Sequence, residues 1–292
     1  MIKLRMVKYG KHRYPATIPL SIEEVAGHFD IRALKPKMNY SLHTEYSFTN
    51  RKWLYEPATR FPVLCAANHK EIPQLWYSTE WAQEFAEFAI ELVGDNQDPS
   101  IIEIHPPFED YCPDIQTFLN RYQIFEKIIK SRFHDVKIMI ENRSGSRYGK
   151  SAFLFSKVDS LISLSKEIDR SGSDLRITLD IPQVYTAHNV KQNSSDRIVS
   201  LLHQLKGIRH NISGIHLWGK KENENGRRSA HSGDLNTYFY HDIMLKDNFL
   251  KALHSLLDDE VVRVLVLEVN GSNEDLHSII KDLDTISVQY VS

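Results

Sequence analysis

The chain has 292 residues, of which 41% are hydrophobic and 25% are charged, and its formal net charge is −2. This balance gives no bulk attraction to nucleic acid or to a membrane surface, so any such binding must come from a local patch. The two cysteines, Cys65 and Cys112, form no CxxC pair and imply no disulfide framework. With no long apolar run and no signal-peptide core at the N-terminus, the sequence predicts a cytoplasmic protein without a membrane span.

Short β-like runs alternate with helical periods along most of the chain. The expected strands are 4–9, 39–46, 100–107, 136–143, 175–182, 212–219 and 261–270. The expected helices are 78–94, 113–131, 153–169, 193–207, 242–257 and 273–284. In the first of these helices, Ser78 is the expected N-cap and Gly94 the expected C-terminal stop. Strands that alternate with helices of this length indicate βαβ units and a parallel sheet.

The N-terminal quarter is less regular than the rest. We expect a short helix over 21–29 and an eighth strand over 30–34. Eight strands would close a (β/α)8 TIM barrel, a fold that often runs to this length as one domain. The sequence therefore predicts a single α/β barrel domain over residues 1–292.

Six of the expected strands deliver a histidine or a carboxylate at their last inward position. Side chains alternate along a strand, so Met139 and Glu141 point inward where Ile138 and Ile140 point toward covering helices. Active sites of such barrels are built at the C-terminal ends of the strands. The six residues are His43, His105, Glu141, Asp180, His216 and Glu268.

Taken singly, each of these residues has an ordinary explanation. A strand-end histidine is usually a satisfied structural residue, and a strand-end carboxylate often caps the following helix. Taken together, three carboxylates and three imidazoles would repel or desolvate one another unless cations bound them. The set offers only nitrogen and oxygen ligands and is too large for one tetrahedral metal, so it predicts two metal ions.

The predicted ligands lie in motifs with a definite order and spacing. The segments are LHTEYSFTN (42–50), EIHPP (103–107), IENRSGS (140–146), LDIPQ (179–183), IHLWGKK (215–221) with SAHSGD (229–234), and VLEVNG (266–271). This series resembles the apurinic/apyrimidinic endonucleases of the endonuclease IV type, within the xylose-isomerase-like superfamily of TIM barrels. The resemblance covers about 40–270.

The resemblance implies roles for the six residues. His43, His105 and Glu141 would hold one metal, and Glu141 would bridge to a second metal held by Asp180, His216 and Glu268. It implies two divalent ions and zinc as the first expectation, although carboxylate-rich histidine sites also accept manganese or iron.

The resemblance breaks at the family's third zinc. Gln183 stands where the family has a histidine ligand, and Ser229 stands where it has an aspartate ligand, so only His231 remains. His188 is an alternative ligand on the same loop. We therefore expect two metals, with His231 acting as a substrate-facing acid, base or hydrogen-bond donor.

Basic residues fall in loops that the barrel topology places at the same mouth. They suggest a phosphate-bearing substrate such as DNA, although acidic neighbours in those loops also fit an ordinary solvated surface. Trp53, Tyr55, Tyr148 and Trp218 lie nearby in the sequence, and could stack on a base or could pack in the core. The expected substrate-binding residues are Arg143, Arg147, Lys220, Arg227 and Arg228.

The resemblance favours a metal-dependent hydrolase that acts on a phosphodiester in DNA or in a nucleotide-like substrate. Glu141, Glu268 and His231 are the expected catalytic residues. A sugar isomerase or epimerase of the same superfamily is the first alternative, and it would need only Glu141, Asp180, His216 and Glu268. A multinuclear iron oxidase and a non-enzymatic binding protein are further alternatives.

Overall fold

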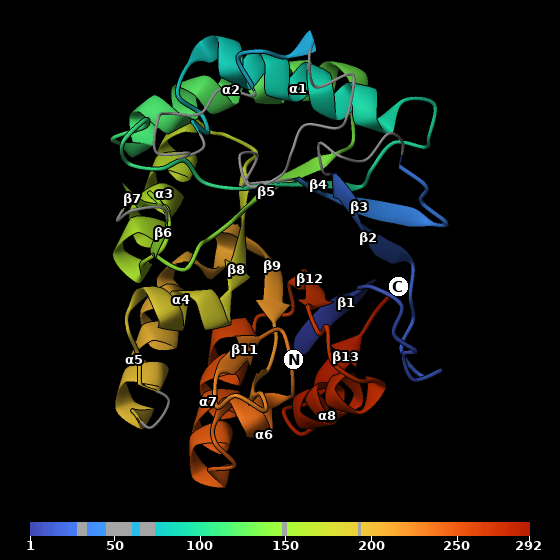
Figure 1. Cartoon of the computed structure of the whole chain (residues 1–292), viewed down its shortest axis with the longest axis vertical. Helices are drawn as coiled ribbons and strands as arrows, with labels where there is room; N and C mark the ends of the chain where they lie inside the picture. The colour runs from blue at the N-terminus through green and yellow to red at the C-terminus, as the bar shows by residue number, and fades with distance from the viewer. Residues whose placement is uncertain (28–33, 45–59, 65–73, 148–150, 192–193) are drawn as a thin grey trace. The chain divides into compact units, whose positions relative to one another are not determined.

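The structure is a computed structural model that describes residues 1–27, 34–44, 60–64, 74–147, 151–191 and 194–292 (Figure 1). The strands of its main sheet are β1 (Ile2–Lys8), β2 (Ile22–Gly27), β3 (Asn39–Thr44), β4 (Ile101–Ile104), β5 (Lys137–Glu141), β8 (Arg176–Asp180), β9 (Ile212–Leu217), β12 (Val262–Leu267) and β13 (Val288–Tyr290). Their order is β12-β9-β8-β5-β4-β3-β2-β1-β13, with a further pairing between β12 and β1. This is the strand order of a (β/α)8 barrel, the fold class that the sequence predicts.

The chain divides into two compact units. Unit 1 comprises Met1–Ile22 with Thr178–Ser292, and unit 2 comprises Glu23–Ile177. The expectation of a single domain stays a prediction. Within the described part of the chain, no helix has both the length and the apolar character that a membrane crossing requires.

Unit 2 contains the parallel strands β3, β4 and β5, whose register pairs His43 with Glu103 and Ile104 with Ile140. Its other elements are α1 (Thr79–Val93), α2 (Ile115–Arg132), α3 (Val158–Ser171), β6 (Ser146–Arg147) and β7 (Ser151–Ala152). The predicted boundaries of α1 are confirmed, because the Ser78 side chain accepts from the Trp81 N–H and Gly94 has a φ of +53°.

An aromatic core in unit 2 supports the end of β4. Trp76 lies at its centre, with ring centroids 5.0 Å from Trp81, 5.6 Å from Phe85 and 5.5 Å from Phe125. The indole N–H of Trp76 donates to the backbone carbonyl of His105 at 2.8 Å. The packed core thereby fixes the backbone that carries His105.

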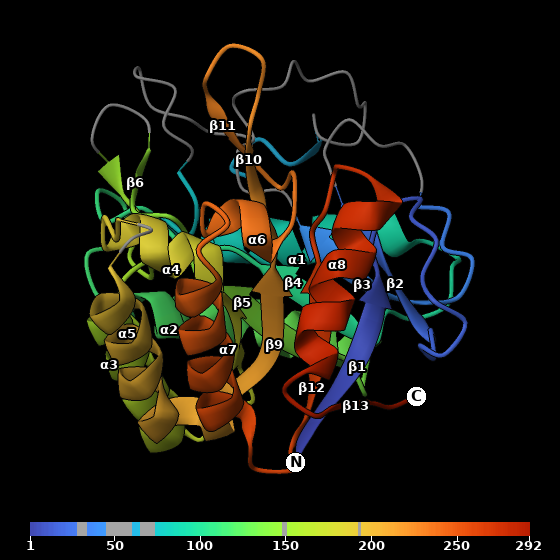
Figure 2. The ribbon, with the colours of Figure 1, turned by 90° about the horizontal axis from the view of Figure 1, so that it is seen from below.

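In unit 1, β9 pairs with β12, and β12 pairs with β1, all in parallel. Its remaining elements are α4 (Ile181–Ala187), α5 (Ser195–Leu205), η3 (Lys206–Asn211), β10 (Lys220–Glu222), β11 (Arg228–Ala230), α6 (Leu235–Tyr238), α7 (Ile243–Leu257) and α8 (Asn273–Asp284). Figure 2 shows the β10–β11 hairpin extending beyond the end of β9. The hairpin is the basic segment that follows His216.

The helix expected over 21–29 is wrong, because Ile22–Gly27 forms strand β2. Glu23, Glu24 and Ala26 favour helix locally, but sheet pairing overrides that weak preference. Gly27 packs so closely that an added Cβ would lie 2.9 Å from Leu42 of β3. β2 supplies the eighth strand, in place of the one expected at 30–34. Residues 30–33 lie outside the described part of the chain, and Leu34 is in no strand.

Gly214 gives a test of the strand packing in unit 1. A Cβ at Gly214 on β9 would lie 2.7 Å from Thr178 Oγ1 on β8. We expect Gly214→Ala to lower the free energy of unfolding by about 1–3 kcal/mol through overpacking. Gly207→Ala is the matched control, because no atom lies within 4 Å of its added Cβ. Urea unfolding of both variants checks this, and equal stabilities would contradict the packing.

Candidate metal centres

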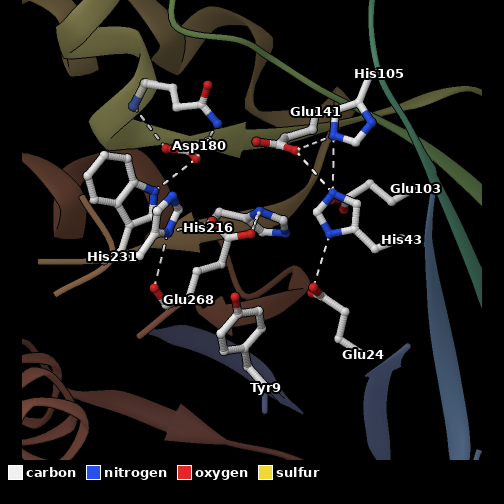
Figure 3. Close-up of polar contacts among 12 residues, drawn as sticks. Tyr9, Glu24, His43, Glu103, His105, Glu141, Asp180, His216, His231 and Glu268 are labelled. Atoms are coloured by element: carbon white, nitrogen blue, oxygen red, sulfur yellow. Dashed lines mark hydrogen bonds and ion pairs between the residues drawn. The ribbon is translucent and has the colours of Figure 1, made fainter. Parts of the chain in front are cut away.

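The first group of predicted ligands lies in unit 2, at the ends of three neighbouring strands. His43 is the fifth of the six residues of β3, His105 follows β4 directly, and Glu141 is the last residue of β5. Strand alternation and pairing bring their side chains together, as the sequence predicts (Figure 3). His105 and Glu141 are buried, and the His43 side chain is 17% exposed.

Three ligand atoms of this group converge. The Nε2 atoms of His43 and His105 are 3.1 Å apart, and Glu141 Oε2 lies 3.4 Å from the first and 2.9 Å from the second. The centre of this triangle is about 1.8 Å from each atom, so a cation slightly above its plane would reach all three at zinc-ligand distances of about 2.0–2.1 Å. The donor set and its spacing fit a divalent metal.

Two side chains orient these ligands. Glu24 Oε1 lies 3.0 Å from His43 Nδ1, which leaves Nε2 as the atom nearest to His105 and Glu141. Arg143 Nη1 donates to both carboxylate oxygens of Glu141 at 3.1 Å. A carboxylate behind a ligating histidine is a common support of metal sites because it fixes the ring and its tautomer.

The electrostatics of the group separate its two histidines. Burial lowers the pKa of His105 to about 4, so its imidazole is neutral at pH 7. Burial also opposes protonation of His43, but the carboxylates of Glu24 and Glu103 hold its pKa well above the usual value. Burial would raise the pKa of Glu141, yet Arg143 and the two histidines hold it well below the usual range. A cation would therefore meet an ionised carboxylate and one neutral imidazole, and would displace a proton from His43.

Sequence reasoning missed Glu24 and Glu103. Glu103 is buried, and its Oε1 lies 3.7 Å from His43 Nε2. The sequence does indicate Glu103: this residue lies on β4 two residues before His105, so the two side chains share a face. Glu24 could not be found by this rule while its segment was interpreted as a helix.

The second group lies in unit 1. Asp180 ends β8, His216 lies in β9 and Glu268 follows β12 directly. One ligand atom from each lies within 4.8 Å of those of the other two, and all three residues are buried. His216 Nδ1 is 3.4 Å from Glu268 Oε1. This group also offers only nitrogen and oxygen atoms, which suits a divalent cation.

Asp180 has two roles at once. Its Oδ1 accepts from the backbone N–H of Gln183 at 2.9 Å, which makes it the N-cap of α4. Its Oδ2 accepts from the Gln183 side-chain amide at 2.8 Å and from the Trp218 indole N–H at 3.0 Å. The ordinary interpretation of a strand-end carboxylate is thus true of Asp180, and the cap holds it in place beside His216 and Glu268.

The residues expected around a third metal have other contacts. Gln183, which replaces the family's histidine, positions Asp180 through its side-chain amide. His231 has a φ of +58°, and its Nδ1 lies 3.2 Å from the Glu268 carbonyl oxygen and 3.4 Å from Glu268 Oε2. Its ring lies 4.4 Å from that of Trp218. Ser229 is exposed on β11, and His188 ends α4.

The expected substrate-binding residues lie in different settings. Arg143 is held against Glu141, and its side chain is only 12% exposed. Arg228 donates to backbone carbonyls, while Lys220 is half-buried and Arg227 is exposed. Arg147 lies in β6, but its side chain is outside the described part, as are Trp53, Tyr55 and Tyr148. The role of these residues in substrate binding stays a prediction, and Trp218 is buried against Asp180 and His231.

Comparison with known proteins gives a fold-level likeness. No model of a known protein family matches the chain, and no curated protein matches it in sequence. The crystal structure of AsfvAP:AG is similar over 86% of this chain and 75% of that chain, with 12% identity and a TM-score of 0.51.

Two further solved structures have lower TM-scores. A xylose isomerase domain protein from Planctomyces limnophilus covers 94% of this chain and 98% of its own, with 13% identity and a TM-score of 0.44. A beta-glucosidase from Thermotoga maritima in complex with deoxynojirimycin is similar over 86% of this chain and 73% of its own, with 10% identity and a TM-score of 0.40. At these identities the similarity to AsfvAP:AG shows a shared fold, and the chemistry must be argued from the side chains.

Proposed function

We propose that the protein is a metal-dependent hydrolase that acts on a phosphodiester in DNA or in a nucleotide-like substrate. The observation that carries this proposal is the His43–His105–Glu141 group, which exists in addition to the Asp180–His216–Glu268 group. A single-metal sugar isomerase needs only Glu141, Asp180, His216 and Glu268, and has no need of His43 and His105 as ligands. The two added histidines, as possible ligands of a further cation, therefore favour hydrolytic chemistry with two cations.

The chain's own residues prepare the two centres. When bound, divalent cations would supply Lewis acidity and activate a water molecule for attack on phosphorus. Glu24 orients His43, and Gln183 with Trp218 orients Asp180. His231 lies beside Glu268 and could move a proton or donate a hydrogen bond to substrate. The joint use of both centres, including the bridging role of Glu141, comes from the family resemblance.

Strand cleavage of duplex DNA with a single abasic site tests the proposal. Protein loaded with zinc, manganese or iron should nick this strand, and EDTA should abolish the activity. His43→Ala should lower the rate about 100-fold or more, because catalytic metal centres are sensitive even to changes around their ligands. His203→Ala, at an exposed position on α5, is the matched control and should cut at the wild-type rate.

Two other outcomes would replace the proposal. Metal-loaded protein that leaves abasic DNA intact but interconverts aldoses and ketoses would be an isomerase. Protein that consumes oxygen only when loaded with iron would be an oxidase on the same barrel.

Restoring the lost ligands is a further prediction. Gln183→His together with Ser229→Asp should raise the bound metal from two to three per chain and speed cleavage, because His231 is retained and a third cation can stabilise the leaving oxygen. Each single variant is a control and should bind two metals. A double variant that binds a third metal without faster cleavage would contradict the hydrolase proposal.

A further inference from the structure

Unit 1 contains a cavity that is lined by residues other than the predicted metal ligands. Its volume is about 790 Å³, within the range of small-molecule sites, and none of the six predicted ligands lines it. The walls come from the end of α4 and its following loop, from β10, and from α6 and its following turn. The residues that matter below are Asn189, Lys191, Lys220, Arg228, Tyr238 and Tyr240.

Arg228 holds two walls of this cavity together, β10 and α6 with its following turn. Its Nη2 donates to the carbonyl oxygens of Lys220 at 2.6 Å and Tyr238 at 3.3 Å, and its guanidinium lies 3.8 Å from the centroid of the Tyr240 ring. The planar guanidinium presents its donors in a rigid fork, which the ammonium of a lysine does not. Arg228 therefore fixes β10 against α6 and the turn that follows it.

The lining carries more positive than negative charge. Lys191, Lys220 and Arg228 line it, and Asp242 is the one acidic residue among the lining residues. Asp242 caps α7 by accepting from the Leu245 N–H at 3.0 Å. Within the described part of the chain, neither lysine forms an ion pair. Two ammonium groups are thus available for an anion.

Tyr240 gives the cavity an exposed aromatic surface. Tyr240 is 58% exposed, although one face of its ring lies under Arg228. It has a φ of +53° and is followed by His241 at +61°, and Asn189, which also lines the cavity, has a φ of +50°. Non-glycine residues with a positive φ carry backbone strain that is often retained at ligand sites. The arrangement offers a platform on which a planar ring can stack.

We propose that this cavity binds a nucleoside monophosphate or a phosphorylated ligand of the same size. The phosphate would lie between Lys191 and Lys220, and the planar base would stack on Tyr240. Charge selects the phosphate, the aromatic face selects the ring, and Arg228 joins the Lys220 backbone to the Tyr240 ring. Lys220 and Arg228 are also expected substrate-binding residues of the proposed hydrolase, but none of the six predicted metal ligands lines the cavity, so binding here can be measured without metal.

Binding to metal-free protein tests the proposal without depending on the metal centres. Calorimetric titration in EDTA should show adenosine 5′-monophosphate binding more tightly than ribose 5-phosphate, and adenosine binding weakly. Lys191→Ala with Lys220→Ala should weaken both phosphates at least 10-fold. Tyr240→Ala should weaken the nucleotide and leave ribose 5-phosphate unchanged. Lys251→Ala, at an exposed position on α7, is the control and should bind as the wild type does.

Three results would overturn this proposal. They are no monophosphate binding at millimolar concentration, binding that the lysine and tyrosine variants leave unchanged, and binding of single-stranded oligonucleotides alone. The last would make the cavity part of a strand-binding surface. Far-UV circular dichroism and thermal unfolding of each variant separate lost binding from lost folding, and a failure of DNA cleavage leaves this test untouched.

Discussion

Changing Glu141 to glutamine should lower metal affinity more than any other conservative substitution in unit 2. Glu141 Oε2 lies within 3.4 Å of both histidine Nε2 atoms, and the amide would remove the charge while keeping the shape. Substitution of a residue that only supports a ligand typically lowers metal affinity about 10- to 100-fold, so loss of the ligand itself should lower it further. Competition with a fluorescent chelator measures the change.

The number of metals whose affinity falls shows whether Glu141 binds one metal or both. The resemblance assigns Glu141 to both metals, so Glu141→Gln should weaken the second metal as well, whereas His43→Ala should weaken one. Arg143→Met is the control, because it removes the guanidinium that donates to Glu141 and leaves the Glu141 carboxylate in place. Unchanged affinity in Glu141→Gln would show that the group is a hydrogen-bonded network without a metal.

Changing Asp180 to asparagine should destabilise the metal-free protein. The buried carboxylate accepts three N–H groups, two from Gln183 and one from Trp218. Asparagine can still cap α4, and Gln183 can turn its amide oxygen toward the new NH2 group, but the Trp218 N–H then loses its acceptor. A buried donor without a partner costs about 1–3 kcal/mol, and loss of the charged acceptor adds to it, so we expect about 2–4 kcal/mol.

Trp218→Phe provides the matched comparison for Asp180→Asn. It removes the indole N–H and keeps an aromatic ring against His231. Trp218→Phe should therefore lower the free energy of unfolding less in the Asp180→Asn background than in the wild type. Urea unfolding in EDTA would show this difference. Equal costs in both backgrounds would mean that the two side chains do not act together.

Much of the fold could be predicted because apolar periodicity is a local property. Strands with strong β-branched runs, such as Val262–Leu267, and helices with clear caps, such as Thr79–Val93, were found with small errors at their ends. Ile22–Gly27 was missed because Glu23, Glu24 and Ala26 favour helix on their own. Only its pairing within the sheet makes this segment extended.

The grouping of the predicted ligand residues could be predicted because strand alternation fixes which side chains share a face. His43, His105 and Glu141 meet for this reason, and so do Asp180, His216 and Glu268. The supporting contacts could not be predicted in the same way. The bond from Gln183 to Asp180 depends on the first turn of α4, and the contact of Glu24 with His43 depends on β2.

Metal content per chain tests the central claim most directly. Protein purified without added metal should contain two divalent cations by inductively coupled plasma mass spectrometry. His43→Ala and His216→Ala should each retain one, and His203→Ala should retain two. A metal-free wild-type protein that takes up no zinc, manganese or iron, or ligand variants that keep both ions, would contradict the account.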